Sequence, residues 1–201
     1  MALTFRTASS ADLPALRDVF GHEPSDEQVG LAGGDRSRAR RFRDLIASQL
    51  FNPPGLARTT VAVDGDEVVG FVQAGVEAGI SLWIVAGTVR IFGWRTPGFV
   101  RRDRARSTVH LAPPPGAYHI AEIHVLSTRR NRGIGEALLD ESEHQARSQG
   151  FGTMSLTTTT SNPARRLYER FGFDLVETRE SEPYRAATGI AGRILMVKRL
   201  A

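Results

Sequence analysis

A loop rich in arginine and glycine carries the residue types of an anion-binding site. It reads Arg-Arg-Asn-Arg-Gly-Ile-Gly over residues 129–135, between an apolar strand and a helix. Glycine lets a backbone approach a ligand closely, and the free N–H groups at a helix start favour a phosphate. Arg130 and Arg132 add charge and directional donors. We interpret the loop as a pyrophosphate cradle; the alternative is a glycine-rich turn whose arginines face solvent.

The spacing of this loop matches neither the Walker nor the dinucleotide-binding pattern, so the elements around it must decide its role. Apolar alternation predicts strands, and apolar residues at helical spacing predict helices. The predicted strands are residues 3–8, 59–63, 68–76, 118–125, 153–159, 173–179 and 194–199, and the predicted helices are residues 9–20, 36–50, 132–149 and 162–171. Asp64-Gly65 predicts a hairpin turn. Residues 21–35 contain four glycines and show no clear period.

Composition and charge bound the class of protein. With 201 residues, of which 41% are hydrophobic, the chain is long enough for one domain over residues 1–201 with a sizeable core. The absence of cysteine excludes disulfide scaffolds, thiolate zinc sites and cysteine nucleophiles, and the scattered histidines predict no metal site. The net charge of +4 favours anionic ligands weakly and does not by itself predict nucleic-acid binding. No secretory signal is visible, and we expect a cytoplasmic protein.

Residues 77–117 form an unusual segment between the third and fourth predicted strands. Residues 80–94 are mostly apolar, are interrupted by Arg90, and predict a buried or interfacial helix that is shorter than the roughly 20 residues needed to span a bilayer. A basic run with the single acid Asp103 follows, and Pro-Pro-Pro-Gly at residues 113–116 closes the segment. We expect the segment to pack on its own domain or to form a dimer contact, in preference to membrane contact.

Two stretches resemble the acetyl-CoA-binding core of the GNAT superfamily of N-acetyltransferases. The first is residues 122–139, which contain the arginine–glycine loop, and the second is residues 162–173, Asn-Pro-Ala-Arg-Arg-Leu-Tyr-Glu-Arg-Phe-Gly-Phe. The order of elements between them, one helix and one strand, is also similar to the family. The resemblance implies an α/β (α+β type) fold with a mixed, mostly antiparallel central sheet of about six or seven strands, flanked by helices. Residues 77–117 would then be a helical and basic insertion between the third and fourth strands.

The same resemblance implies which residues hold acetyl-CoA as a co-substrate, without a metal. The backbone of residues 123–125 would pair with the pantetheine amides as an added strand would. The N–H groups of residues 130–135 would hold the pyrophosphate, and part of the segment 162–165 would lie near the CoA arm. The implied cofactor-binding residues are Ile123, His124, Val125, Arg130, Asn131, Arg132, Gly133, Ile134, Gly135, Asn162, Ala164 and Arg165.

Tyr168 and Glu122 are the implied catalytic residues. Tyr168 matches the tyrosine that protonates the departing thiolate in many family members, a role that suits a hydroxyl with a pKa of about 10; the alternative is packing on a short helix. The general base stays open between Glu122, His119, His124 and water, with Glu122 preferred and a salt bridge as its structural alternative. Strict alternation places Glu122 and His124 on one face of the strand and His119 on the other. A β-bulge, frequent in this strand of the family, would break that parity.

These inferences predict an N-acetyltransferase that moves an acetyl group from acetyl-CoA to a primary amine by direct nucleophilic attack. The acceptor would be a small molecule or a peptide. Two alternatives stay open: a catalytically silent GNAT-fold module that binds or senses a ligand, and a peripheral membrane or partner-binding protein that acts through the basic insert, residues 80–106. We expect no nucleic-acid partner and leave a homodimer open.

Overall fold

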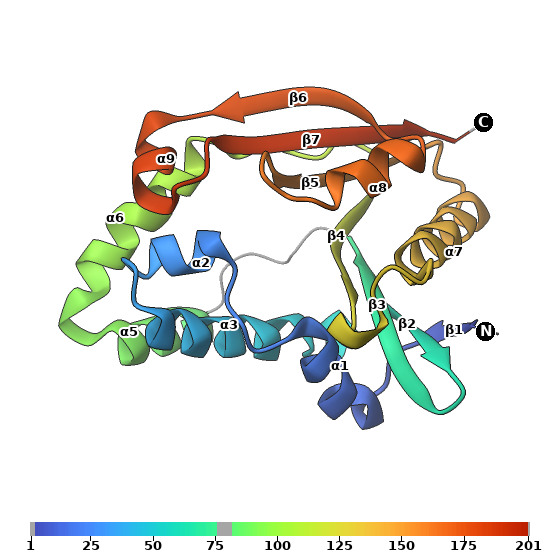
Figure 1. The fold of residues 1–201 in the computed structure, drawn as a ribbon, viewed down its shortest axis with the longest axis horizontal. Helices are drawn as coiled ribbons and strands as arrows, with labels where there is room; N and C mark the ends of the chain where they lie inside the picture. The colour runs from blue at the N-terminus through green and yellow to red at the C-terminus, as the bar shows by residue number, and fades with distance from the viewer. Residues whose placement is uncertain (1–2, 76–81, 201) are drawn as a thin grey trace.

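A seven-stranded sheet organises the structure (Figure 1). This computed structural model describes residues 3–75 and 82–200. The strands are β1 (Leu3–Thr7), β2 (Thr59–Asp64), β3 (Glu67–Ala74), β4 (Tyr118–Val125), β5 (Thr153–Thr159), β6 (Asp174–Glu180) and β7 (Gly192–Arg199). They lie in the order β1-β2-β3-β4-β5-β7-β6, and each neighbouring pair is antiparallel except β4 with β5. The predicted mixed, mostly antiparallel sheet is confirmed.

Helices flank both faces of the sheet. They are η1 (Ser10–Asp12), α1 (Leu13–Phe20), α2 (Asp26–Leu31), α3 (Arg36–Leu50), α4 (Pro53–Leu56), α5 (Leu82–Phe92), η2 (Gly93–Arg95), α6 (Thr96–Ser107), η3 (Ser127–Arg129), α7 (Ile134–Ser148), α8 (Arg165–Arg170) and α9 (Glu182–Thr188). The four predicted helices correspond to η1 with α1, α3, α7 and α8. The sequence does not predict α2, α4 and α9, because six, four and seven residues are too few to show a helical period. It does not predict α6 either, because these 12 residues are rich in arginine and form no apolar stripe.

Two hydrophobic clusters lie on opposite faces of the sheet. On one face, α7 and α8 cover the central strands, and Leu138 of α7 is fully buried there. On the other face, α1 and α3 cover β2 and β3 around Phe71. Successive side chains of β2 point alternately into the two clusters: Ala62 belongs to the first cluster, whereas Val61 and Val63 belong to the second.

The two central strands β4 and β5 diverge soon after they meet. Their parallel pairing runs only from Tyr118 with Met154 to Ile120 with Leu156. Beyond Ile120, β4 continues beside β3, whereas β5 continues beside β7, and the two strands separate (Figure 1). The edge of β4 that faces β5 is therefore left without a neighbouring strand over residues 121–125 of the described chain.

A β-bulge in β4 decides which side chains share a face. Gln73 of β3 pairs with Glu122, but the next residue, Ala74, pairs with Ile120, which leaves Ala121 as an extra residue. Tyr118 and Ile120 before the bulge, and Ile123 and Val125 after it, all pack in the α7 cluster. The faces to which odd- and even-numbered side chains of β4 point are thus exchanged at Ala121. His119, Glu122 and His124 consequently share the opposite face. The separation of His119 that strict alternation gives is wrong, and the β-bulge named as its alternative is present.

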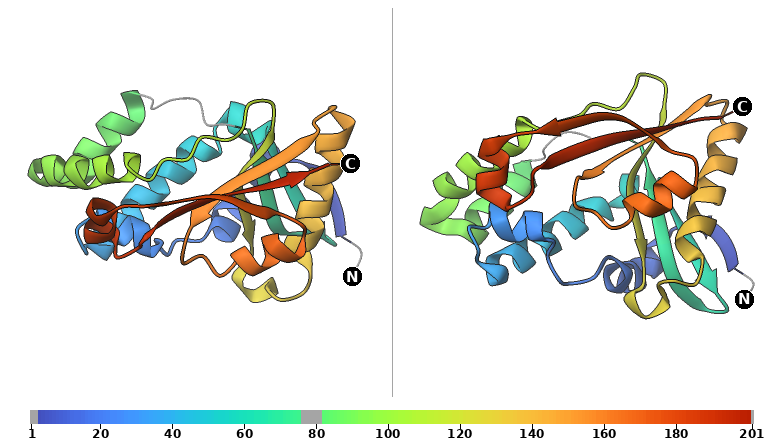
Figure 2. Two further views of the ribbon diagram at one scale, coloured as in Figure 1. Left: turned by 90° about the horizontal axis from the view of Figure 1, so that it is seen from above. Right: turned by 45° about the horizontal axis from the view of Figure 1, so that its top comes forward.

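The described part of the segment 77–117 packs on the rest of the chain. Phe92 of α5 stacks on Phe99 of α6 with ring centroids 4.3 Å apart, and Phe42 of α3 lies 4.9 Å from Phe99. α5 contacts α3, α6 contacts α9, and both inserted helices lie at the end of the molecule away from α7 (Figure 2). Residues 77–81 lie outside the described residues. None of the helices in the described ranges has the length and apolar character to cross a membrane.

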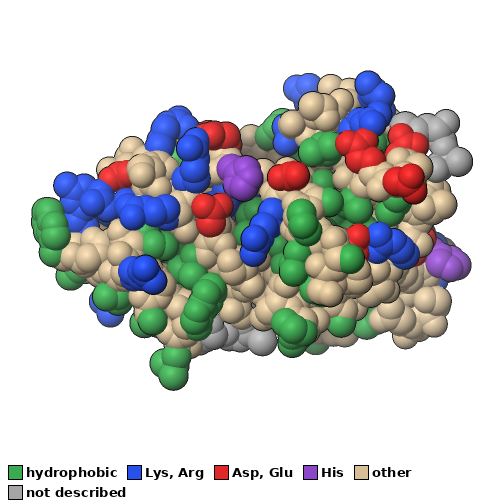
Figure 3. Space-filling view, turned by 90° about the horizontal axis from the view of Figure 1, so that it is seen from below, with side chains coloured by type: hydrophobic (Ala, Val, Ile, Leu, Met, Phe, Trp, Pro, Cys, Tyr) green, Lys and Arg blue, Asp and Glu red, His purple; other side chains and the backbone are tan. Residues whose placement is uncertain are grey.

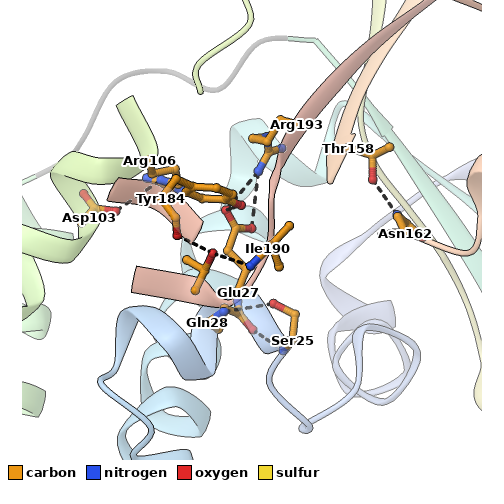
Figure 4. Close-up of polar contacts among 11 residues, drawn as sticks. Ser25, Glu27, Gln28, Asp103, Arg106, Thr158, Asn162, Tyr184, Ile190 and Arg193 are labelled. Carbon is orange, nitrogen blue, oxygen red and sulfur yellow. Dashed lines mark hydrogen bonds and ion pairs between the residues drawn. The ribbon is translucent and has the colours of Figure 1, made fainter. Parts of the chain in front are cut away.

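Tertiary contacts tie α2 to the connection between β6 and β7. The Tyr184 hydroxyl of α9 donates to the Glu27 carboxylate at 2.7 Å, and Arg193 of β7 donates to the same carboxylate at 3.2 Å (Figure 4). A Cβ on Gly30 would lie only 2.5 Å from Thr188 Cα. Helix α2 is therefore held against α9 by close backbone approach and by a partly buried polar network, which explains how so short a helix forms.

Replacing Gly30 with alanine is expected to destabilise the protein. Alanine alone would stabilise the interior of a helix by about 1 kcal/mol relative to glycine. Here the new Cβ would meet backbone atoms of α9, and overpacking of this kind costs about 1–3 kcal/mol. Chemical denaturation should show a net loss for Gly30→Ala but none for Gly152→Ala, where a Cβ meets nothing within 4 Å. A Gly30→Ala protein more stable than wild type would contradict the packing of α2 on α9.

Candidate functional site

The loop between β4 and α7 presents backbone donors at a helix start. Asn131 (φ 60°) and Gly133 (φ 80°) both adopt left-handed conformations, and Gly133 is the N-cap of α7. The N–H of Ala137 donates to the carbonyl of Gly133. The N–H groups of residues 134–136 precede that bond and have no acceptor within the helix. Consecutive N–H groups at the positive end of a helix form an anion-binding arrangement.

The space in front of this loop is open, as a phosphate ligand requires. A Cβ on Gly133 would meet nothing within 4 Å, and residues 130–132 are exposed. By contrast, a Cβ on Gly135 would lie 3.1 Å from Leu167 Cδ2, so glycine there permits close packing of α7 on α8. The backbone donors and the open space fit a pyrophosphate group.

The arginines of the loop differ in how they are held. Arg129 forms an ion pair with Glu67 at the start of β3, which anchors the loop to the sheet. Arg130 makes only a long contact, 3.5 Å, from Nε to the carbonyl of Val125, and its side chain is otherwise exposed. Arg130 is therefore available to an anion, whereas Arg129 is engaged in positioning the loop.

Beside the loop, β4 offers an open backbone edge. Residues 123–125 pair with β3 through one edge, and their other edge faces the gap that opens where β5 departs. The side chains of Ile123 and Val125 pack against the α7 cluster, so it is the backbone that borders the gap. An extended ligand with amide groups can pair with such an edge as an added strand does.

Asn162 and Arg165 lie where β5 leads into α8. The Asn162 Oδ1 accepts from the Ala164 N–H at 2.9 Å. Its Nδ2 donates to Thr158 Oγ1 at 2.6 Å (Figure 4). These bonds fix the turn before α8, which begins at Arg165 rather than at residue 162 as predicted. The Arg165 guanidinium pairs with Glu169 at 2.7 Å. Asn162 is thus a structural anchor of this turn, and Arg165 has an intrahelical partner.

Tyr168 of α8 is buried next to the gap and stays protonated. Its exposed fraction is 5%, and its ring lies edge-on to Phe173 with centroids 6.3 Å apart. Burial, and to a smaller extent the charge of Glu122, raises the pKa of Tyr168 to about 12. Its hydroxyl forms no hydrogen bond with another residue in the described ranges. It is therefore a neutral O–H that is free to donate.

Glu122 and His124 form a hydrogen-bonded pair on the face of β4 away from α7. His124 Nε2 lies 2.8 Å from Glu122 Oε2, and the side chains are 24% and 35% exposed. The imidazole is held between Phe20 and Phe71, with ring centroids 5.0 and 5.1 Å away. This packing fixes the ring, so the carboxylate it contacts is oriented as well. A partly exposed carboxylate paired with imidazole can accept a proton directly or through water.

His119 shares this face but sits deeper in the sheet. Its Nδ1 lies 3.0 Å from Ser155 Oγ on β5. Burial lowers the pKa of His119, which favours the neutral imidazole. Of the three residues left open as bases, His119 is thus tied to the closed part of the sheet, whereas Glu122 and His124 lie beyond the point where β4 and β5 separate.

Arg43 is a residue of this site that the sequence analysis missed. Its guanidinium lies 3.8 Å from the centre of the Phe20 ring, and its Nε donates to the Gly21 carbonyl at 2.7 Å. Burial is the larger effect and lowers the pKa of Arg43, while the charge of Glu122 opposes it. A signal was present in the sequence, because Arg43 lies four residues from both Ala39 and Ala47 on the buried stripe of α3.

Comparison with known proteins identifies the family. The model of the Acetyltransferase (GNAT) family matches residues 20–173 of this chain. That range holds the arginine–glycine loop, the open edge of β4, and Tyr168. The chain belongs to the GNAT acetyltransferase family. A search of curated proteins found no match.

Solved structures support the same fold. A protein from Corynebacterium glutamicum described as histone acetyltransferase HPA2 and related acetyltransferase has 21% identity and a TM-score of 0.62, covering 100% of this chain and 98% of its own. PaiA N-acetyltransferase from Thermoplasma acidophilum, solved in complex with coenzyme A, has 14% identity and a TM-score of 0.60, covering 100% of both chains. The ribosomal-protein-S18-alanine N-acetyltransferase of Escherichia coli has 16% identity and a TM-score of 0.59, and the match covers 100% of this chain and 95% of that one. At these identities the likeness shows the fold alone.

The burial of the tyrosines predicts an unusual alkaline titration. The chain has three tyrosines; burial raises the pKa of Tyr118 and Tyr168 to about 12, and burial together with Glu27 raises that of Tyr184. The ultraviolet absorbance of tyrosinate in the native protein should therefore stay flat through pH 10 and rise only near pH 12, whereas in denaturant it should titrate at about 10.

The same shifts make the protein less stable in strong alkali. Because the folded-state pKa values lie above the unfolded ones, the stabilisation is complete below about pH 10 and is lost as the pH rises toward the folded values. Tyr168→Phe should remove one phenol from the native titration. A native absorbance step near pH 10 would contradict the burial of these side chains.

Proposed function

We propose that this chain transfers an acetyl group from acetyl-CoA to a primary amine by direct attack of the amine on the thioester. The observation that carries the proposal is that three features lie near one another where β4 and β5 separate. These features are the backbone donors at the start of α7, the protonated hydroxyl of Tyr168, and the Glu122–His124 pair. Glu122 is close enough to Tyr168 to raise its pKa, and Gly135 of α7 packs against Leu167 of α8. Membership of the GNAT acetyltransferase family supports the same reaction class.

The proposed role of the loop is to hold the pyrophosphate of acetyl-CoA, which supplies an activated acyl group as a thioester. The N–H groups of residues 130–135 and the exposed Arg130 would bind the phosphate oxygens, and the open edge of residues 123–125 would pair with the amides of the pantetheine arm. Ala164 and the anchored turn at Asn162 would border that arm. A structural neighbour that was solved with coenzyme A supports this assignment.

Tyr168 is the proposed general acid. Loss of the thiolate from an acyl group requires a proton or a hydrogen bond at sulfur, and a phenol held in its neutral form can supply either. The raised pKa of Tyr168 keeps that proton in place throughout the physiological range. Its neighbour Phe173 packs edge-on against the ring and restricts its orientation.

Glu122 is the proposed general base, with His124 as the residue that orients it. The amine must lose a proton to attack, and a carboxylate at the open part of β4 can accept it directly or through water. Glu122 is preferred to His119 because His119 is bonded to Ser155 within the paired part of the sheet. Arg43 would hold the loop at Phe20 and Gly21 against α3 and so keep Phe20 packed on the His124 ring.

The first test of the cradle is isothermal titration with acetyl-CoA and with CoA. Gly133→Glu should weaken binding by about 100-fold or more, equivalent to about 3 kcal/mol, because it adds negative charge where the pyrophosphate would lie. Gly150→Glu is the matched control, since Gly150 follows the other end of α7 and has a similar φ of 78° with nothing within 4 Å of a Cβ. It carries the same strain without facing the loop. Retained affinity in a folded Gly133→Glu protein would disprove the cradle.

A second test separates the acid from the base. After a screen of primary amines with thiol release as the readout, Tyr168→Phe and Glu122→Gln should each lower kcat by about 100-fold. Acetyl-CoA affinity should change little, because neither residue holds the phosphates. His119→Gln serves as the control and should retain most activity. An unchanged kcat in Tyr168→Phe would remove its role as acid, and a large loss in His119→Gln alone would transfer the role of base to that residue.

A further inference from the structure

The outward face of α5 is apolar and has no partner in the described chain. Its exposed side chains include Leu82 (87%), Trp83 (55%), Val85 (47%) and Val89 (50%), and Trp94 in η2 is 83% exposed. Hydrophobic side chains project at this end of the molecule beside Lys and Arg side chains (Figure 3). A helix with apolar residues on both sides is normally covered on both sides. The exposed face, which we name the α5 face, is therefore a candidate interaction surface.

The α5 face cannot turn inward, because the other side of the helix is fixed. Thr88 and Phe92 are buried, and a Cβ on Gly87 would lie 2.7 Å from both methyl carbons of Leu45 on α3. Glycine at this position allows the two helices to approach closely, and rotation of α5 would break that contact. Exposure of Val85 and Val89 is thus a consequence of the packing of α5.

The inserted helices carry net positive charge, and two arginines border the α5 face. Residues 82–107 contain six arginines and a single acid, Asp103, so this stretch alone exceeds the net charge of +4 of the whole chain. Arg41 of α3 and Arg90 of α5 line a groove of about 460 Å³ together with Trp83 and Asp44. The Asp44 carboxylate lies 3.6 Å from His22. Neither Arg41 nor Arg90 forms an ion pair with another residue in the ranges that the structure covers.

We propose that the α5 face binds the surface of an anionic lipid bilayer, with α5 lying in the plane of the interface. Leucine and valine side chains would enter the acyl boundary, and tryptophans would sit at headgroup depth, where their amphipathic rings are favoured. Arg41 and Arg90, which line the same groove as Trp83, would contact lipid phosphates. The helix lies on the membrane in this arrangement and does not cross it.

Charge favours a lipid surface over a second copy of this chain. An isologous dimer through the α5 face would bring together two surfaces that each carry Arg41 and Arg90, and like charges repel across such an interface. An anionic bilayer offers the opposite charge and a flat apolar layer below it, which matches the combination of exposed valine and tryptophan with flanking arginine.

The experiment uses an intrinsic probe, because the chain has two tryptophans: Trp83 lies on the α5 face and the exposed Trp94 lies in η2 directly after α5. The full-length protein is mixed with vesicles of phosphatidylcholine alone or of phosphatidylcholine with phosphatidylserine, and tryptophan emission and co-sedimentation are recorded. Anionic vesicles should shift the emission to the blue and sediment the protein, and neutral vesicles should do neither. Soluble glycerol phosphate, which supplies the headgroup chemistry without a bilayer, should leave the emission unchanged.

Variants locate the surface. Val89→Glu should weaken vesicle binding by at least about tenfold, because it places charge in the acyl boundary. Arg41→Gln and Arg90→Gln should each weaken it about fivefold. The matched controls lie elsewhere: Val176→Glu on β6, where valine is 60% exposed, and Arg199→Gln at the exposed end of β7. All variants should bind acetyl-CoA as wild type does, since none lies in the proposed cofactor site.

Three outcomes would overturn the proposal. The first is an absence of binding to anionic vesicles by the folded wild-type protein. The second is binding that Val89→Glu leaves intact, which would assign the membrane contact to another surface. The third is a blue shift that grows with protein concentration without lipid, together with a dimer in sedimentation velocity that Val89→Glu dissociates. That result would make a second copy the occupant of the α5 face.

Discussion

The division of the sheet after Ile120 is the constraint on which the rest of the site depends. Only three residue pairs join β4 to β5, yet each strand keeps one full partner, β3 for β4 and β7 for β5. The opening therefore leaves backbone groups unpaired along one edge of each strand without weakening the rest of the sheet. In the chain, η3 and the loop at the start of α7 follow β4, and the short helix α8 follows β5. A loop of backbone donors, a buried phenol and an open strand edge meet because the two strands separate.

The bulge at Ala121 gives that opening its chemistry. Without it, His119 would lie on one face of β4, and Glu122 and His124 would lie on the other. The apolar side chains before and after the bulge would likewise point to opposite faces of the sheet. With it, apolar side chains pack under α7 on both sides of the bulge, and the three titratable side chains share one face. The different surroundings of Tyr168 and Glu122 then give these two residues different roles. Tyr168 is buried and keeps its proton, whereas Glu122 is partly exposed and raises the pKa of Tyr168 further.

The sequence predicts the helices and strands that a local residue pattern determines. It does not predict the features that tertiary contacts determine. The strands at 118–125 and 153–159 and the helix at 36–50 have the predicted bounds, because alternation and helical spacing are properties of the segment itself. Helix α2 depends on Glu27 and Gly30 meeting α9, a contact that no local period reveals. The bulge could be anticipated only from the resemblance to the GNAT family. The burial of Arg43 could be predicted only by counting this charged residue among the buried positions of α3.

Helix α3 connects the two surfaces described above. On one side, Arg43 holds the backbone at Phe20 and Gly21, and Phe20 packs on His124 of the candidate site. On the other side, Leu45 packs against Gly87 of α5. Since a helix of 15 residues transmits its orientation rigidly over its length, the direction of the α5 face is fixed relative to the gap between β4 and β5. A surface that binds the α5 face would thus also determine from which side an acceptor can approach Glu122.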